Sequence, residues 1–483
     1  MDSKSPRVRF APAPTGLMHL GNVRTALMNY LFAKQKTGTF ILRIEDTDPK
    51  RNFDPGAKKI IEDLQWLGLY YNEGPIKGGP YAPYFQSERT ALYQEKLNQL
   101  KDKGLVYRCF CTLEELRKKR QQQLMLKLPP RYDRTCLGLS ESKIQDRLDK
   151  NTPFIWRMKL DINQTIKVLD LARGTIQFDL KHFSDFPLTR QDGSFTFIFA
   201  NCVDDAVMKI THVLRGEDHL TNTANQAVLY QAFDITLPLF WHLPILCNTE
   251  GKKLSKRDFG FTLQDLKGSG FLPEAICNYL AIIGGGIFEQ EIMSLEELVK
   301  TINFDNIHST GYVRYDIEKL RWINHKWIDR YDFKKLAQVA RPFLEKQFPK
   351  ATELGDPKLA QLLQTIKTDL ITLQDVPNTL HFYFEKPDIT TKMLTQHIPN
   401  QLQPLIASII TKQLHTIGDP DTFTEVIKQE AKKIKIPLQT IFAAVRIALI
   451  GSAQGPSIHD LVDMLGSKEA SHRIKNVLQS FKK

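Results

Sequence analysis

The spacing of hydrophobic residues near the start of the chain predicts a strand, a helix and a second strand. The stretch VRFA at residues 8–11 is mostly apolar and is broken off by Pro12 and Pro14, so it predicts a short strand. Apolar side chains then recur every three or four residues, at Leu20, Val23, Leu27, Tyr30 and Leu31. This spacing predicts a helix that begins near residues 19–21. The run TFILRI at 39–44 is apolar on both faces, as a buried parallel strand is.

Strand, helix and strand in this order form one βαβ unit of a nucleotide-binding α/β fold. A second block with a similar pattern of apolar residues covers residues 195–218. The stretch between the two blocks, residues 91–187, carries the charged run EELRKKRQQQ and the hairpin-like YRCFCT, and we interpret it as an α+β insertion. From about residue 325 onward the spacing is helical, with a division near the proline-containing stretches at 376 and 387. The pattern predicts a Rossmann-like α/β catalytic domain followed by an all-α region.

Composition narrows the class of protein. The 483 residues suggest several domains, and 66 Lys and Arg against 54 Asp and Glu give a formal net charge of +12. This excess is compatible with a polyanionic partner such as a nucleic acid. No apolar run is long enough to span a membrane, and the first ten residues contain no hydrophobic signal core. We therefore expect a cytoplasmic protein without a membrane partner.

The loop after the first strand carries candidate phosphate-binding chemistry. Neither GxxxxGK[ST] nor GxGxxG occurs there, whereas PTGLMHLGN covers residues 14–22. Gly21 at a helix start allows a nucleotide to approach the backbone, and the free N–H groups of that helix end attract phosphate. His19 adds a side-chain donor on the same edge. Alternatively, a single histidine before a helix caps it or packs against it.

A second basic motif, KLSKR, covers residues 253–257. By itself it could be a solvated loop or a patch that resembles a nuclear localisation signal. Together with His19 it suggests a mobile loop that brings two ammonium groups onto a triphosphate, where charge neutralisation and alignment assist displacement of pyrophosphate.

The two motifs resemble the "HIGH" and "KMSKS" signatures of class I aminoacyl-tRNA synthetases. Further stretches resemble the glutamyl-tRNA synthetase family: RIEDTDP (43–49), YAPYFQSER (81–89), NCVDD (201–205), THVLRGEDHL (211–220), FLPEAICNYL (271–280), KLRWINHKWI (319–328) and VRIALIGSAQGPSIHDLVDMLG (445–466). The likeness covers nearly the whole chain, and the helical C-terminal third resembles the bacterial type. It implies a monomeric enzyme that activates L-glutamate with ATP and Mg²⁺ and transfers the glutamyl group to the 2′-hydroxyl of the terminal adenosine of tRNA(Glu).

The resemblance also assigns site residues, with His19, Lys253 and Lys256 as the catalytic ones. The ATP-binding positions are Pro12, Thr15, Gly16, His19, Gly21, Asn22, Lys253, Ser255, Lys256 and Arg257. The glutamate-binding positions are Arg9, Ala11, Ala13, Glu45, Phe197, Asn201, Arg215 and Asp218. A guanidinium binds a carboxylate in fork geometry, so Arg9 and Arg215 are both candidates for the γ-carboxylate, and Glu45 is expected to receive the α-ammonium.

Several of these positions have alternative interpretations. Arg9 and Glu45 could form a structural ion pair, and Asp204 and Asp205 could cap a helix, so neither aspartate is assigned to the site. Phe197 stands where many relatives carry tyrosine, and Ala13 stands where serine is common in the loop. Both changes remove a hydroxyl from the expected glutamate pocket.

Three of the six cysteines lie in the insertion, at Cys109, Cys111 and Cys136. Some relatives bind a structural Zn²⁺ at these positions, and Gly138 stands where a histidine ligand often is. The fourth donor would then be Tyr132 or water. The alternative is three reduced cysteines that only pack together.

Six segments follow from this reading, and the scope of the tRNA substrate is a further question. The segments are 1–90 and 188–240 (the two halves of the catalytic domain), 91–187 (the insertion), 241–322 (a stem-contact region with KLSKR), and 323–375 and 376–483 (two anticodon-binding subdomains). Asp369 lies near the position that restricts some relatives to glutamate anticodons, which raises the hypothesis that tRNA(Gln) is also charged. The competing functions are a non-catalytic RNA-binding relative, a shorter paralogue that glutamylates a tRNA base, and a glutaminyl enzyme.

Overall fold

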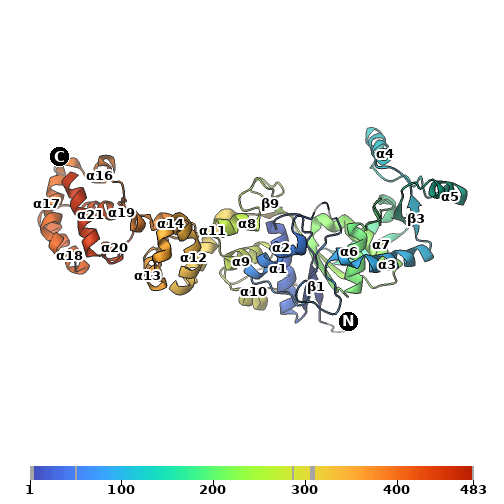
Figure 1. Cartoon of the computed structure of the whole chain (residues 1–483), viewed down its shortest axis with the longest axis horizontal. Helices are drawn as coiled ribbons and strands as arrows, with labels where there is room; N and C mark the ends of the chain where they lie inside the picture. The colour runs from blue at the N-terminus through green and yellow to red at the C-terminus, as the bar shows by residue number, and fades with distance from the viewer. Residues whose placement is uncertain (1–4, 49, 51, 286–287, 305–310, 481–483) are drawn as a thin grey trace. The chain divides into compact units, whose positions relative to one another are not determined.

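A computed structural model describes residues 5–48, 50, 52–285, 288–304 and 311–480. The chain divides into two compact units, one of residues 1–268 with 273–320 and the other of residues 269–272 with 321–483 (Figure 1). Pro49, the last residue of the RIEDTDP motif, lies outside the described residues. We call the first part the catalytic unit, after the role that the sequence predicts for it, and the second the helical unit.

Two parallel strand pairs form the centre of the catalytic unit, and the second belongs to a mixed four-stranded sheet of order β6-β5-β8-β7. β1 pairs in parallel with β2, and β7 pairs in parallel with β8. Thr211, next to β7, donates its backbone N–H to the oxygen of Arg7 in β1 at 3.0 Å, which joins the two pairs. The strands are β1 Arg7–Phe10, β2 Thr39–Leu42, β3 Val106–Cys109, β4 Ile155–Met158, β5 Thr165–Asp170, β6 Gly174–Asp179, β7 His212–Gly216, β8 Leu239–Leu243, β9 Leu246–Cys247 and β10 Val313–Arg314. The predicted βαβ unit is confirmed, with its second strand two residues shorter than expected.

Ten helices of the described residues begin and end inside the catalytic unit. They are α1 Leu20–Gln35, α2 Lys58–Trp66, α3 Thr90–Asp102, α4 Leu113–Met125, α5 Glu141–Asp149, α6 Phe197–Val207, α7 Leu220–Ala232, α8 Leu263–Gly268, α9 Pro273–Ile283 and α10 Leu295–Thr301. α1 begins where the apolar spacing predicts, and Asn29 within it donates to the backbone oxygen of Leu214 in β7 at 3.1 Å. α1 therefore lies against the parallel strands, and this contact holds the N-terminus of the helix in place.

The insertion is α+β, but its strand pairing differs from the expectation. YRCFCT does not form a hairpin by itself, because β3 pairs antiparallel with β4, in which Cys109 faces Ile155. The residues after β3 instead start α4, whose first residue follows a capping box between Thr112 and Glu115. The Ser/Thr-x-x-Glu pattern at the start of α4 outweighs the local turn tendency.

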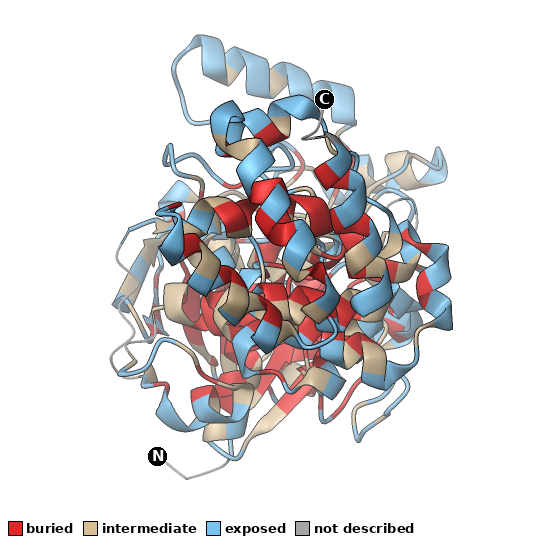
Figure 2. Cartoon of the chain, turned by 90° about the vertical axis from the view of Figure 1, so that its left-hand side faces the viewer, coloured by how far each residue is buried: buried red, intermediate tan, exposed pale blue. Residues whose placement is uncertain are grey.

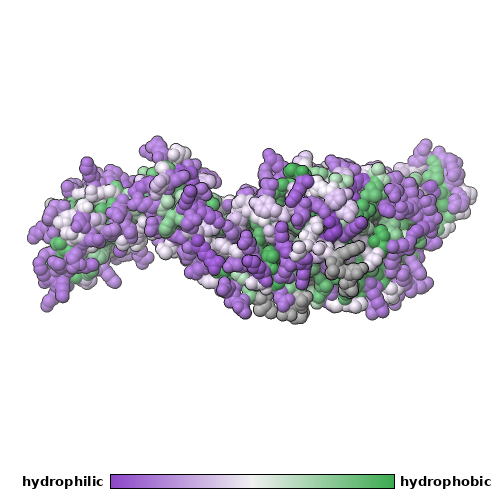
Figure 3. Space-filling view, turned by 90° about the horizontal axis from the view of Figure 1, so that it is seen from below, coloured by the Kyte–Doolittle hydropathy of each residue, from purple (hydrophilic) through white to green (hydrophobic). Residues whose placement is uncertain are grey.

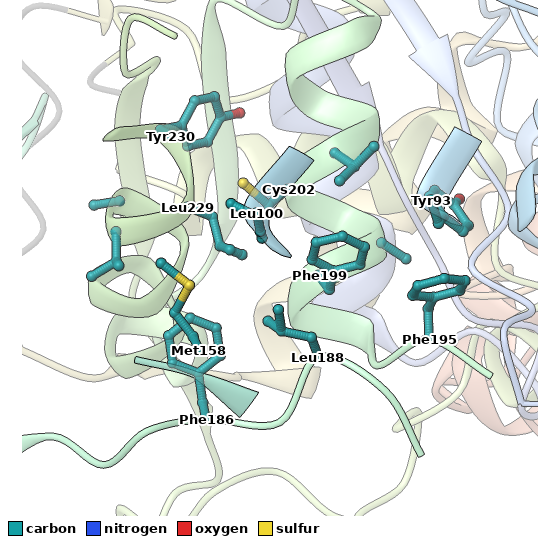
Figure 4. Packing of buried hydrophobic residues seen from close by; sticks show 14 of the residues in the cluster. Tyr93, Leu100, Met158, Phe186, Leu188, Phe195, Phe199, Cys202, Leu229 and Tyr230 are labelled. Atoms are coloured by element: carbon teal, nitrogen blue, oxygen red, sulfur yellow. The ribbon is translucent and has the colours of Figure 1, made fainter. Parts of the chain in front are cut away.

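A buried cluster of aromatic and aliphatic side chains supports α6. Phe195 lies 5.4 Å from Phe199 and 5.5 Å from Tyr93 between ring centroids (Figure 4). Phe199 and Cys202 of α6 are fully buried, and Leu188 and Met158 belong to the same cluster. The packing fixes the rotation of α6 and thereby the direction in which its polar residues point.

The helical unit contains only helices and turns among its described residues, as the sequence predicts. Its helices are α12 Phe333–Gln347, α13 Asp356–Ile366, α14 Asp375–Thr379, α15 His381–Phe384, α16 Thr391–His397, α17 Gln403–Gln413, α18 Pro420–Lys433, α19 Leu438–Ile450, α20 Ile458–Leu465 and α21 Ser467–Ser480, and α11 Ile317–Arg330 leads into it. Buried residues lie along one side of these helices and exposed residues along the other, as amphipathic spacing requires (Figure 2).

The molecular face in Figure 3 is mostly hydrophilic, with hydrophobic residues in smaller groups. Among the described residues, no helix is both long and apolar enough to cross a bilayer.

Candidate functional site

Three residues predicted for the glutamate pocket, Arg9, Glu45 and Arg215, lie in or just after β1, β2 and β7, near the carboxyl ends at which open α/β sheets bind ligands. The loop after β1 is held to β2 because Glu45 donates its backbone N–H to the oxygen of Pro12 at 2.9 Å. Pro12 itself is buried. The other assigned positions of this loop are exposed or half-buried: Ala11, Ala13, Thr15 and Gly16.

His19 is the N-cap residue of α1, so the capping interpretation describes it correctly. Its Nδ1 accepts the backbone N–H of Asn22 at 3.3 Å, and the Asn22 side chain accepts the N–H of His19 in return. The ring also lies 5.5 Å from the ring of Phe261, between centroids. Gly21 makes this position possible, because an added Cβ there would lie 3.0 Å from His19 Nδ1 and Cε1.

Two distant segments are joined by backbone hydrogen bonds at this point. Leu20 donates to the oxygen of Phe261 at 2.9 Å, and Leu263 donates to the oxygen of Met18, also at 2.9 Å. These bonds attach the segment that follows the KLSKR motif to the segment that carries His19. The structure therefore brings the two predicted phosphate-directed motifs together.

The KLSKR loop, which precedes Phe261 in the chain, has an exposed, basic surface. Leu254 is buried and donates its N–H to the oxygen of Leu246 at 2.8 Å, and Asp258 accepts the N–H and hydroxyl of Ser255 at 2.8 and 2.9 Å. The remaining residues of the motif are exposed: Lys253, Ser255, Lys256 and Arg257.

Charges on both sides of His19 act on its ring. The Lys253 Nζ lies 3.6 Å from an Asp218 carboxylate oxygen. Although much of the residue is exposed, the pKa of His19 lies below its ordinary value because protein atoms keep water from the ring. The ammonium of Lys253 lowers this pKa further, and Asp218 opposes it. The ring is therefore neutral at pH 7, and Asp218, assigned from the sequence to the glutamate pocket, faces the phosphate-directed side.

A network of buried charges underlies the predicted glutamate pocket. Arg9 donates from Nε and Nη2 to the Asp205 carboxylate at 3.0 and 3.1 Å, and Arg43 donates to Asp205 at 2.7 Å and to Glu45 at 3.0 Å. Glu45 also accepts from the amide of Asn201 at 2.5 Å. The pKa of Glu45 is raised by burial, which Arg43 and Asn201 partly offset. We call Arg9, Arg43, Glu45, Asn201 and Asp205 the buried-charge network.

This network corrects two expectations. Arg9 pairs with Asp205 rather than with Glu45, so the proposed structural pair between Arg9 and Glu45 is wrong. Asp204 and Asp205 lie inside α6 and do not cap it. Asp204 accepts hydrogen bonds from the side chains of three residues: Gln86, Arg89 and Tyr93. The sequence does not reveal the pair of Arg43 and Asp205, because the two residues lie 162 positions apart along the chain.

Arg215 is a buried guanidinium of the predicted glutamate pocket whose hydrogen bonds are incomplete. It is 6% exposed, and its Nη2 donates to the Thr223 hydroxyl at 2.6 Å. Its Nε and Nη1 make no hydrogen bond within the part of the chain that the structure describes. Burial and the like charge of Arg9 lower the pKa of Arg215 to about 10. A buried cation with two unused donors is suited to an anionic ligand. The ring of Phe197 lies nearby against His219, at 5.4 Å between centroids.

The three cysteines of the insertion lie together. Their Sγ atoms are within 4.8 Å of one another, and the Tyr132 hydroxyl lies 3.3 Å from Cys109 Sγ and 3.9 Å from Cys111 Sγ. The hydrogen bond with Cys136 is the main cause that lowers the pKa of Cys109 to about 4. Three clustered sulfurs and a nearby phenol form a donor set that fits a tetrahedral zinc ion.

Asp369 lines a polar cavity of about 500 Å³ in the helical unit. The other lining residues are Thr365, Thr368, Thr379, Ile450, Gln454, Gly455 and Pro456. Because the side chains are mostly polar, the cavity is suited to hydrogen-bonding groups.

Comparison with known proteins identifies the family. Residues 6–322 match the family described as "tRNA synthetases class I (E and Q), catalytic domain", and residues 335–478 match "Anticodon binding domain". The chain is 36% identical to the glutamate–tRNA ligase of Clostridioides difficile and 34% identical to that of Bacillus pumilus, over 98% of its own length and 98% and 99% of theirs. The chain belongs to the glutamate–tRNA ligase family.

Solved structures of this family support the fold as well. The glutamate tRNA ligase of Elizabethkingia meningosepticum, in complex with its amino acid, has a TM-score of 0.88 and 31% sequence identity, with coverage of 99% of this chain and 100% of that one. The predicted fold class, a class I synthetase catalytic domain with a helical anticodon-binding region, is confirmed. The comparisons give no support to the non-catalytic RNA-binding alternative.

Proposed function

We propose that this chain activates L-glutamate with ATP to form glutamyl-adenylate and then transfers the glutamyl group to the 2′-hydroxyl of the terminal adenosine of tRNA(Glu). The observation that carries the proposal is the attachment of the KLSKR loop beside His19, since it places a neutral imidazole and a basic loop at one sheet edge. Bond formation between the glutamate carboxylate and the α-phosphorus releases pyrophosphate, so the chemistry demands stabilisation of negative charge on phosphate oxygens.

The phosphate side of the site is assigned to His19, Lys253 and Lys256. Neutral His19 donates a hydrogen bond from Nε2, because its Nδ1 is occupied as the acceptor of the helix cap. Lys253 and Lys256 supply compact positive charges from an exposed loop that can approach the triphosphate. Mg²⁺ would accompany ATP and neutralise phosphate charge, and the loop after β1, from Pro12 to Gly16, would border the nucleotide.

We assign the glutamate side of the site to Arg215 and Glu45. Arg9 lies beside them in the same pocket. Asp205 already compensates the charge of Arg9, whereas Arg215 keeps two unused donors in a buried position. A substrate carboxylate would complete the hydrogen bonds of Arg215, and the neutral amide of glutamine would leave its charge without compensation. Glu45 lies 3.0 Å from Arg43 and would accept the substrate ammonium.

Glutamate-dependent ATP–pyrophosphate exchange, measured with tRNA(Glu) present, tests the proposal. Exchange must depend on both glutamate and ATP. We expect Lys256→Ala and Lys253→Ala to reduce it at least about tenfold each, while the neighbouring Lys252→Ala, whose side chain is 77% exposed and pairs with Glu250, keeps wild-type exchange. Failure of the wild-type protein to catalyse exchange with tRNA, glutamate and ATP together would refute the proposal.

We also propose that Cys109, Cys111 and Cys136 bind one structural Zn²⁺ with Tyr132 or water as the fourth donor. The clustering of the three sulfurs supports this assignment. The ion would stiffen the insertion and supply no chemistry to the reaction. Metal analysis of the purified protein should find about one zinc per chain, and Cys136→Ser should reduce that content. Full exchange activity combined with no bound zinc would reject the site.

The scope for tRNA is a finer proposal. Asp369 places a carboxylate, not a positively charged side chain, at the wall of its cavity. This favours the hypothesis that the enzyme charges tRNA(Gln) as well as tRNA(Glu). Aminoacylation of purified tRNA(Gln) decides this, and charging at background level would reject it. We further propose that the enzyme acts as a cytoplasmic monomer, and light scattering at working concentration would reveal a larger assembly.

A further inference from the structure

A chain of four buried side chains leads away from Arg215 into the sheet. Arg215 of β7 and His242 of β8 are direct register partners. The Thr223 hydroxyl, from α7, lies 2.8 Å from His242 Nε2 and accepts Arg215 Nη2 at 2.6 Å. On the other side of the imidazole, Nδ1 lies 2.7 Å from a carboxylate oxygen of Asp170, the last residue of β5.

The directions of these hydrogen bonds follow from the chemistry of each group. Asp170 also accepts the backbone N–H groups of Ala172, Arg173 and His242, so it acts only as an acceptor. His242 Nδ1 must therefore carry a proton. Burial lowers the pKa of His242, so the ring is neutral and Nε2 has a free lone pair. The Thr223 O–H, which lies 3.3 Å from the backbone oxygen of His219, donates to the nearer acceptor, Nε2 at 2.8 Å. The lone pairs of the Thr223 oxygen remain for Arg215.

The chain is buried along its whole length. The exposed fractions are 1% for Asp170, 0% for His242, 0% for Thr223 and 6% for Arg215. His242 is buried and both of its ring nitrogens are hydrogen-bonded within the protein, so it does not contact ATP or tRNA directly. Its effect ends at Arg215, whose Nε and Nη1 make no hydrogen bond within the described residues.

We infer that Thr223 and His242, oriented by Asp170, are positioning residues that hold the Arg215 guanidinium in the rotation in which Nε and Nη1 meet a carboxylate of the glutamate substrate. The inference rests on the proposed role of Arg215. Without the bond to Thr223, a guanidinium on a flexible side chain would lose part of its preorganisation, which weakens binding of the carboxylate more than binding of ATP.

Thr223→Val and Thr223→Ser form the matched pair that tests the inference. Valine keeps the shape and removes the hydroxyl, whereas serine keeps the hydroxyl. In pyrophosphate exchange with saturating tRNA, we expect Thr223→Val to raise the KM for glutamate about tenfold or more and to change the KM for ATP by less than about twofold. Thr223→Ser should restore the KM for glutamate to within about threefold of wild type. Equal KM values for Thr223→Val and wild type, or equal losses in both variants, would overturn the inference.

A double mutant separates positioning from a general structural effect. In an Arg215→Ala background, Thr223→Val should cause little further loss, because its effect passes through Arg215, and independent additive losses would overturn the inference. If the valine variant does not fold, Asp170→Asn tests the same chain of residues. The asparagine amide favours the other imidazole tautomer of His242, so this variant should raise the KM for glutamate but not that for ATP. An Arg215→Lys variant with wild-type KM would refute the role of Arg215 itself. If Arg215→Lys changes the KM for glutamate and Thr223→Val does not, only the positioning role of Thr223 and His242 is refuted.

Discussion

Replacement of Gly21 by alanine should separate activity from stability. The new Cβ would lie 3.0 Å from two atoms of the His19 ring, where ordinary contacts begin near 3.4 Å. The ring must therefore move by about 0.4 Å. Since a misplacement of about 1 Å can cost about 100-fold in rate, we expect kcat/KM for ATP in the exchange reaction to fall by about five- to tenfold.

The same substitution should leave the fold intact. Alanine is favoured over glycine in a helix interior by about 0.5–1 kcal/mol, and Gly21 lies in the first turn of α1. A weakened His19 cap, already long at 3.3 Å, would cost a similar amount, so the two effects nearly cancel. Gly418→Ala is the matched control, because its Cβ would meet no atom within 4 Å and it lies in the helical unit. Unchanged kcat/KM in Gly21→Ala, or a loss of activity accompanied by an equal loss of folded protein, would refute the reasoning.

Three further predictions concern stability. Asp205→Asn should lower the free energy of unfolding by about 3 kcal/mol, since it removes the charge that two buried arginines share, and a loss under about 1 kcal/mol in urea denaturation would contradict this. Burial lowers the pKa of His212 from 6.5 to about 4, so the unfolded chain binds more protons between these values and stability is lost as the pH falls from 6.5 toward 4. His212→Gln should flatten that loss, which denaturation at pH 7.5 and 5.5 would detect, and identical slopes would oppose the assignment. Gly260→Ala should lower the melting temperature, because Gly260 has φ of +75° and an added Cβ would collide with the hydroxyl of Tyr315; a melting temperature equal to that of wild type would count against the strain.

The sequence predicts those features that depend on neighbouring residues. The β1 strand, the start of α1 at His19 and the helical C-terminal region follow from local spacing and from helix-capping chemistry. The partner of β3 could not be predicted in this way, because β4 lies beyond two helices and the pairing depends on tertiary packing.

Long-range charge pairing also escapes local patterns. The sequence shows Asp205 only as one of two acidic residues in a predicted helix. Its ion pairs with Arg9 and Arg43, which compensate both cations, appear only in the folded structure. The motif resemblance named the positions of Arg215 and Glu45 but not the side chains that orient them. Thr223 and His242 carry no signal in the sequence, since threonine and histidine are common in helices and strands without any role in a site.

The backbone bonds between Met18–Leu20 and Phe261–Leu263 have a consequence for synthesis of the protein. His19 is made early, but the segment that fixes its neighbourhood appears only after residue 260 of 483. On a translating ribosome, the nascent chain therefore cannot assemble the proposed nucleotide site until more than half of the polypeptide has been made. We expect fragments that end before Phe261 to hold ATP poorly even where their first strands and helix have folded, so unfinished chains should not consume the cell's ATP.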